Sequence, residues 1–135
     1  CSALLQRALA RFIDDGGYQR HLERIRPHYR DIRALFRAAL ATLPAGLRFD
    51  DPPAGLCLLG EIEPGLDAGR FMAECARLGL LLAPGSDYWN DPRQGNNRFR
   101  ITFGSLAAED IPTVAGILAQ AIGSARQSLE NRSLL

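Results

Sequence analysis

The sequence contains no lysine, since all 16 of its basic residues are arginine. Schiff-base formation, the phosphate grip of P-loop proteins and general-base catalysis by lysine all need an ε-amino group. The chain cannot supply any of these chemistries from its own residues. Its 15 acidic residues nearly balance the arginines, so no overall charge draws it to nucleic acid or to an anionic membrane.

Cysteine and long apolar runs are also scarce. Cys1, Cys57 and Cys75 are odd in number and form no C-x-x-C pair, which argues against a disulfide framework or a zinc site and favours a reducing, cytoplasmic setting. Cys57 and Cys75 lie in apolar runs, where we expect small buried hydrophobes. No apolar stretch is long enough to span a membrane, and no signal-peptide pattern opens the chain. The start without methionine, inside a helical pattern, suggests a fragment or a processed product.

The length of 135 residues, with 47% hydrophobic and 23% charged residues, is typical of one globular domain with its own core. Apolar residues at helical spacing predict a short helix over residues 4–13 and a long amphipathic helix over residues 18–43. Pro27 lies within the long helix, where we expect a kink.

Two further helices are predicted. Asp67 is placed to cap a helix that ends at Gly79. Ser105 is expected to open the last helix, which requires Pro112 to fall in the first turn, and the residues after Gly123 are expected to fray. The strands are expected at residues 47–49, 55–62, 80–83 and 97–103, with a polar loop at residues 86–96. This element order predicts a two-layer α+β fold, in which helices cover a small, mostly antiparallel sheet.

The last predicted strand alternates between apolar and polar residues. Phe99, Ile101 and Phe103 fall on one face, which we expect to enter the core, and Arg98 and Arg100 share the other face with Thr102. Alternation alone therefore does not distinguish Arg100 from Arg98 as a candidate binding residue.

Three segments in this order resemble the C-terminal small domain of a fold-type-I, pyridoxal-phosphate-dependent aminotransferase of the α-aminoadipate or kynurenine transaminase type. The resemblance covers about residues 3–122. Its segments are Tyr18-Gln19-Arg20-His21-Leu22 of the linking helix; Ala54-Gly55-Leu56-Cys57-Leu58-Leu59 together with Leu82-Ala83-Pro84-Gly85-Ser86-Asp87-Tyr88; and Asn97-Arg98-Phe99-Arg100-Ile101-Thr102-Phe103.

The resemblance implies roles for four residues. Arg100 would form a paired salt bridge with the α-carboxylate of an amino or keto acid substrate, which suits a planar and permanently charged guanidinium. Tyr88 would lie beside the substrate side chain, Gly55 would leave the approach to the site open, and Asn97 belongs to the same motif as Arg100. The corresponding domain limits are residues 1–17 for the end of the large-domain connection, residues 18–123 for the small domain and residues 124–135 for a frayed tail.

The resemblance also implies which functional groups lie outside this chain. Pyridoxal 5'-phosphate and the catalytic residues would belong to a large domain in the full-length parent, so no catalytic residue and no covalent attachment of the cofactor are expected here. Ala54 and Cys57 depart from the glycine and the aromatic residue of the family pattern, and Pro27 is unusual in the linking helix, which points to an altered substrate pocket.

Three functions stay open at this point. The parent is an aminotransferase; or it is a transcription regulator of the GntR/MocR type, which carries the same domain behind a DNA-binding domain; or the piece is a stand-alone structural module. In each case we expect no direct contact of this chain with nucleic acid and no membrane span. An isolated small domain would expose the apolar face meant for its large domain, so a homodimer is expected.

Overall fold

The structure is a computed structural model that describes residues 2–133, with side chains for residues 2–127. The chain divides between Asp31 and Ile32 into two compact units. The elements are α1 (Ala3–Asp14), α2 (Gly17–Leu40), β1 (Leu47–Phe49), β2 (Cys57–Ile62), α3 (Ala68–Arg77), β3 (Ala83–Pro84), the 3-10 turns η1 (Gly85–Tyr88) and η2 (Pro92–Gly95), β4 (Arg98–Thr102), the 3-10 turn η3 (Ala108–Asp110) and α4 (Ile111–Ser133).

The first unit consists of α1 and the first part of α2. α1 confirms the predicted short helix, and α2 runs without a break through Pro27. The predicted kink at that proline stays a prediction. None of the described helices is long and apolar enough to cross a membrane.

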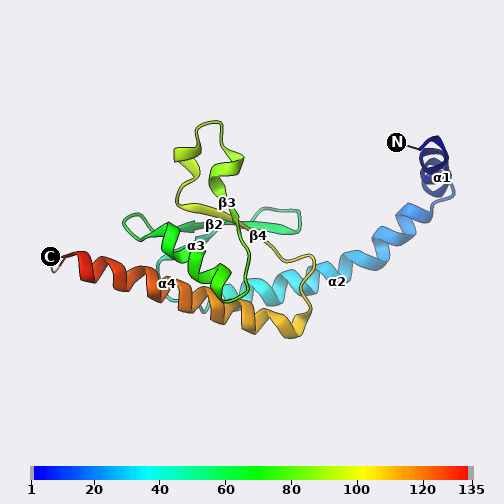
Figure 1. The fold of residues 1–135 in the computed structure, drawn as a ribbon. Coiled ribbons are helices and arrows are strands. Elements are labelled where there is room, and N and C mark those ends of the chain that lie inside the picture. The colour runs from blue at the N-terminus through cyan, green and yellow to red at the C-terminus, as the bar shows by residue number, and fades with distance from the viewer. Residues whose placement is uncertain (1, 134–135) are drawn as a thin grey trace. The chain divides into compact units, whose positions relative to one another are not determined.

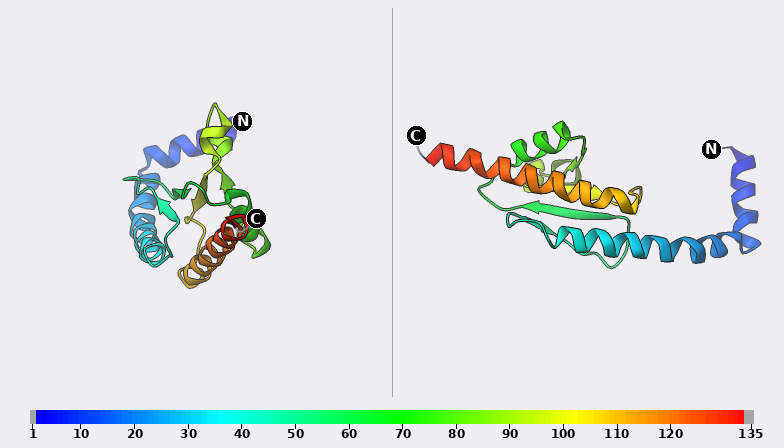
Figure 2. Two further views of the ribbon diagram at one scale, coloured as in Figure 1. Left: turned by 90° about the vertical axis from the view of Figure 1, so that its left-hand side faces the viewer. Right: turned by 90° about the horizontal axis from the view of Figure 1, so that it is seen from below.

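The second unit is a sheet with helices on one face. All strand pairs are antiparallel, in the order β1-β2-β4-β3. Figures 1 and 2 show the end of α2, α3 and α4 on one side of this sheet, with the η1–η2 segment rising from the other. The predicted α+β fold with a small antiparallel sheet is confirmed.

The core lies between the sheet and the helices and is rich in phenylalanine. Phe71 of α3 packs on Phe99 of β4 with ring centroids 5.2 Å apart, and Phe36 of α2 lies 5.8 Å from Phe103. These four rings are fully or almost fully buried. None of the buried residues of the described part is polar or charged, so apolar burial dominates the stability of this unit.

Two sequence predictions about strands and helices need correction. The strand expected at residues 80–83 is reduced to β3, because Leu80 N donates to Cys75 O and so finishes α3, and Leu81 is 85% exposed. The last helix does not open at Ser105: Leu106 N donates to Phe103 O in a turn, η3 follows, and α4 begins at Ile111. Pro112 does fall in its first turn, as predicted.

The frayed end predicted after Gly123 stays a prediction. α4 continues to Ser133, Ala125 is fully buried, and the Arg126 guanidinium donates to the carbonyl of Ala45. Residues 134 and 135 lie outside the described part. The predicted cap at Asp67 is confirmed, since its carboxylate accepts a hydrogen bond from Arg70 N at 2.9 Å.

Gly60 in the middle of β2 provides a test of the core. A Cβ atom there would lie 2.3 Å from Cζ of Phe99, and a buried ring packed under the helices has no room to move. We expect Gly60→Ala to lower the free energy of unfolding by about 1–3 kcal/mol. Gly116→Ala is the control, because a Cβ atom at this exposed position of α4 would meet open space. This substitution should stabilise the helix by up to about 1 kcal/mol. Urea denaturation measures both, and equal effects of the two variants would contradict this packing.

Cys75 provides a second test. Burial raises the pKa of its thiol from the ordinary 9.0 to about 12. Between these values the unfolded chain loses the thiol proton while the folded chain keeps it. The stabilisation is therefore complete below about pH 9 and is lost as the pH rises toward 12, by about 1.4 kcal/mol per pH unit.

Cys75→Ala removes this titration. We expect the difference in unfolding free energy between the wild type and the variant to shrink from pH 8 to pH 11, measured by urea denaturation at each pH. Parallel pH curves for the two proteins would refute a buried, protonated thiol.

Candidate functional site

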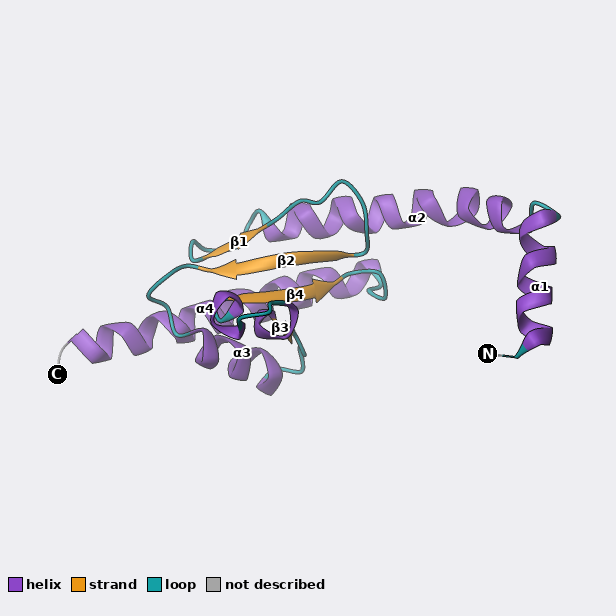
Figure 3. Cartoon of the chain, turned by 90° about the horizontal axis from the view of Figure 1, so that it is seen from above, coloured by secondary structure: helices purple, strands orange, loops and turns teal. Residues whose placement is uncertain are grey.

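The face of the sheet away from the helices carries the candidate site. Cys57, Leu59 and Glu61 of β2 lie there beside Thr102, Arg100 and Arg98 of β4, their respective partners in the antiparallel register. Figure 3 looks onto this open face, with β1, β2 and β4 side by side and α4 behind them. The alternation of β4 therefore has the predicted outcome, with Phe99 and Ile101 buried and Arg100 exposed.

The segment after β3 is held close to the sheet by two glycines. A Cβ atom on Gly85 would lie 2.6 Å from the carbonyl oxygen of Gly95, and one on Gly95 would lie 2.4 Å from the carbonyl carbon of Gly85. The backbone thus crosses itself where no side chain fits, and the predicted polar loop is built around two 3-10 turns. Asp91 caps the N-terminus of η2. Hydrogen bonds from the side chain and the backbone N–H of Arg93 lower the pKa of the Asp91 carboxyl group.

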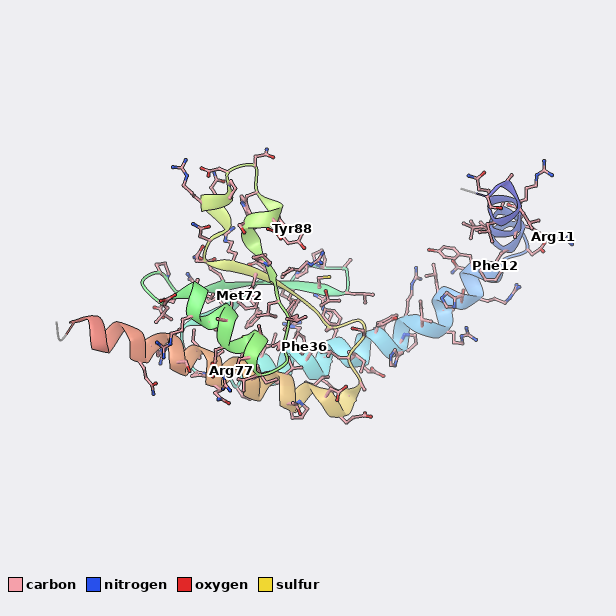
Figure 4. The ribbon with its side chains drawn as sticks, in the orientation of Figure 1. Arg11, Phe12, Phe36, Met72, Arg77 and Tyr88 are labelled. Atoms are coloured by element: carbon pink, nitrogen blue, oxygen red, sulfur yellow. The ribbon has the colours of Figure 1, made fainter. Side chains whose placement is uncertain are left out.

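This crossing presents two aromatic rings to the two arginines of β4. The guanidinium carbon of Arg100 lies 5.0 Å from the ring centroid of Tyr88, and that of Arg98 lies 5.2 Å from the ring of Trp89. Both distances are within the range of a cation–π contact. Figure 4 shows Tyr88 on the side of the sheet opposite Phe36.

The two arginines differ in their acidic partners. Arg98 Nη2 lies 3.6 Å from a carboxylate oxygen of Glu61. Among the described side chains, none of the ion pairs involves Arg100. A cation that is held by an aromatic ring and has no anion beside it is suited to an anionic ligand. The geometry thus separates two residues that strand alternation does not.

Arg100 and Tyr88 line a hollow of about 490 Å³, within the usual size range of small-molecule sites. Its walls combine the arginine and two aromatic rings with apolar side chains from β2 and with the segment after β1. The lining residues are Asp50, Asp51, Pro52, Cys57, Leu58, Leu59, Tyr88, Trp89 and Arg100.

Asn97 and Gly55 do not line this hollow. The Asn97 amide donates to Glu61 Oε1 at 3.3 Å and to the Ile62 carbonyl at 3.2 Å, so it joins the start of β4 to β2. Gly55 has a φ of +102°, and a Cβ atom there would meet open space within the chain. Its backbone conformation alone favours glycine, and its role in keeping an approach open stays a prediction.

Sequence reasoning missed several lining residues. Cys57, expected to be buried in the core, is half-buried on the open face, where its Sγ lies 3.3 Å from Thr102 Oγ1. The position of Cys57 could have been inferred from strand alternation, because Cys57 and Leu59 alternate with the buried Leu58. The sequence indicates Trp89 only as a loop aromatic, and Asp50 only as a turn residue. No group of three or more metal-ligating side chains occurs among the described residues.

The chain is similar in structure to parts of solved aminotransferases. The multiple substrate aminotransferase of Thermococcus profundus matches with a TM-score of 0.78 and 22% identity, over 87% of this chain and 29% of its own. LysN, the α-aminoadipate aminotransferase of Thermus thermophilus, matches with a TM-score of 0.76 and 23% identity, over 88% and 31%. The kynurenine aminotransferase of Pyrococcus horikoshii matches with 0.75 and 24%, over 84% and 28%.

These matches confirm the resemblance at the level of fold, and the chain spans about 30% of the length of each of these proteins. LysN was solved in complex with N-(5'-phosphopyridoxyl)-L-leucine, and the kynurenine aminotransferase with PMP. No protein-family model matches the sequence, and no curated protein matches it either.

The stacking of Arg100 on Tyr88 can be tested without any ligand. We expect ring currents to shift the side-chain NMR signals of Arg100 upfield of those of Arg48, which is 75% exposed at the same sheet. Tyr88→Leu should abolish this shift and Tyr88→Phe should keep it, because only the ring is needed. The Arg98 signals, shifted by Trp89, serve as the internal control. An Arg100 shift that survives Tyr88→Leu would rule out the contact.

Proposed function

We propose that this chain, which has the fold of the small domain of fold-type-I, pyridoxal-phosphate-dependent aminotransferases, is the substrate-carboxylate-binding domain of such an enzyme acting on α-amino and α-keto acids. The observation that carries the proposal is the Arg100 guanidinium, which faces a hollow and has no acidic partner among the described side chains. A guanidinium offers a carboxylate two parallel N–H donors and stays charged at working pH.

The chain's own residues have separate parts in this proposal. Arg100 binds and orients the substrate carboxylate, and Tyr88 restricts the guanidinium by stacking on it. The apolar side chains of Leu59 and Trp89 cover the substrate side chain and displace water from it. Positioning of this kind can supply a large share of a rate enhancement by holding the reacting atoms in place.

The residues of this chain do not form a binding site for the pyridoxal group. It supplies an electron sink when bound, and its covalent attachment needs a lysine, which the sequence lacks. The hollow contains one cation, Arg100, which the proposal gives to the substrate. We therefore assign the cofactor, the catalytic residues and the missing lysine to a large domain of the parent protein.

The same proposal accounts for the exposed apolar stripe of α1. Leu4, Leu5 and Leu9 are 76%, 70% and 56% exposed, and none of the side chains of α1 is buried. Apolar helix faces of this size are normally covered, and we propose that the large domain covers this one. A homodimer of the parent is part of the same proposal.

The test is the full-length protein with Arg100→Ala. Loss of a paired, charge-assisted hydrogen bond should cost about 3 kcal/mol in binding the transition state, or about a 100-fold loss of kcat/KM for amino-group transfer. Arg100→Lys should recover only part of this, because an ammonium group lacks the planar pair of donors.

Arg98→Ala is the matched control on the same strand and face. It should change kcat/KM by less than about threefold, because Arg98 is already paired with Glu61. Equal losses in both variants, or no loss in Arg100→Ala, would refute the assignment. A regulator built on the same domain would use Arg100 in the same way, and amino-group transfer by the full-length protein distinguishes the two functions.

A further inference from the structure

Asp50 faces the same hollow as Arg100 from the opposite side of β2. Its backbone N–H donates to Leu59 O at 2.9 Å, so it extends the β1–β2 ladder by one residue beyond Phe49. Leu59 in turn pairs with Arg100. Asp50, Leu59 and Arg100 therefore form one row across three strands on the open face, and all three line the hollow.

The neighbouring acid, Asp51, is already neutralised. Arg33 and Arg37 of α2 both pair with its carboxylate, Arg37 at 2.9 Å, and Arg33 also donates to the Pro52 carbonyl. These contacts fix the segment after β1 against α2. Asp50 has no ion pair and no side-chain hydrogen bond among the described side chains. The hollow thus offers one unpaired cation and one unpaired anion.

The spacing between them suits a short bifunctional ligand. Two strand spacings place the backbones of Asp50 and Arg100 on the order of 10 Å apart. The side chains of Asp50 and Arg100 both stand on the open face of the sheet and line the hollow. Between them lies the apolar side chain of Leu59, with Pro52 and Trp89 at the margin. A chain of methylene groups could pack on this apolar surface between Asp50 and Arg100.

We propose that Asp50 determines substrate class by pairing with a cationic group at the end of the substrate side chain. The substrates would be basic α-amino acids such as L-lysine and L-ornithine, whose carboxylate pairs with Arg100 and whose distal ammonium reaches Asp50. This inference rests on the proposed role of Arg100. It goes beyond it, because carboxylate binding alone does not select among side chains.

The experiment compares three amino acids of nearly equal length in the full-length protein. L-lysine has a cationic end, L-norleucine a neutral end and L-2-aminoadipate an anionic end. For the wild type we expect kcat/KM and calorimetric affinity to favour L-lysine over L-norleucine by about tenfold or more, the effect of one partly desolvated ion pair, and L-2-aminoadipate to be poorest.

Asp50→Asn should remove the preference, with values for L-lysine falling to those for L-norleucine and values for L-norleucine staying within about twofold. Asp50→Arg should favour L-2-aminoadipate. Asp110→Asn is the matched control, since Asp110 is also exposed but lies in η3, outside the hollow. It should leave the order of substrates unchanged.

The inference is overturned if the wild type handles L-norleucine as well as L-lysine, or if Asp50→Asn affects both equally. Failure of the proposed function has a different signature. In that case Arg100→Ala would leave the affinity for L-norleucine unchanged, whereas with the function intact Arg100→Ala weakens every ligand of the series and Asp50→Asn weakens only the basic ones.

Discussion

The two-residue period of β4 ties the core to the open face of the sheet. Phe99, Ile101 and Phe103 must enter the core, where Phe99 contacts both Phe71 and Phe49. Once these residues are buried, strand alternation places Arg98 and Arg100 on the opposite, open face of the sheet. A slip of one residue would bury two guanidinium groups, which costs far more than any surface contact could return. The stability of the apolar layer thus fixes the position of the candidate binding residue.

The surroundings of the two arginines then give them different properties. Glu61 pairs with Arg98, and Arg48 and Asn97 also lie close to the same carboxylate. Arg100 lies against the ring of Tyr88 and has no ion pair among the described side chains. An aromatic ring orients a cation without neutralising its charge. The crossing at Gly85 and Gly95 is what brings both rings to the strand. The ability of this face to bind an anion therefore depends on which of the two arginines lacks an acidic partner.

Much of this arrangement could be predicted from the sequence, for physical reasons. The face of each residue of β4 follows from strict alternation, and the cap at Asp67 follows from the side chain's ability to accept a backbone hydrogen bond. The prediction for residues 80–82 was wrong because an apolar run does not reveal whether its backbone pairs with a strand or closes a helix. Asp50 and Trp89 could not be assigned to the hollow from the sequence, because their positions depend on the pairing of β1 with β2 and on the backbone crossing of Gly85 and Gly95, neither of which the residue pattern specifies.

We propose that the Arg100 guanidinium is the anion-binding group of this domain. This proposal is tested most directly by a crystal structure of the full-length protein with an α-amino or α-keto acid bound. We expect a carboxylate with its two oxygens about 2.7–2.9 Å from two nitrogens of Arg100, while Arg98 stays paired with Glu61. A carboxylate bound elsewhere, with Arg100 left in solvent or paired with a residue of the large domain, would contradict it.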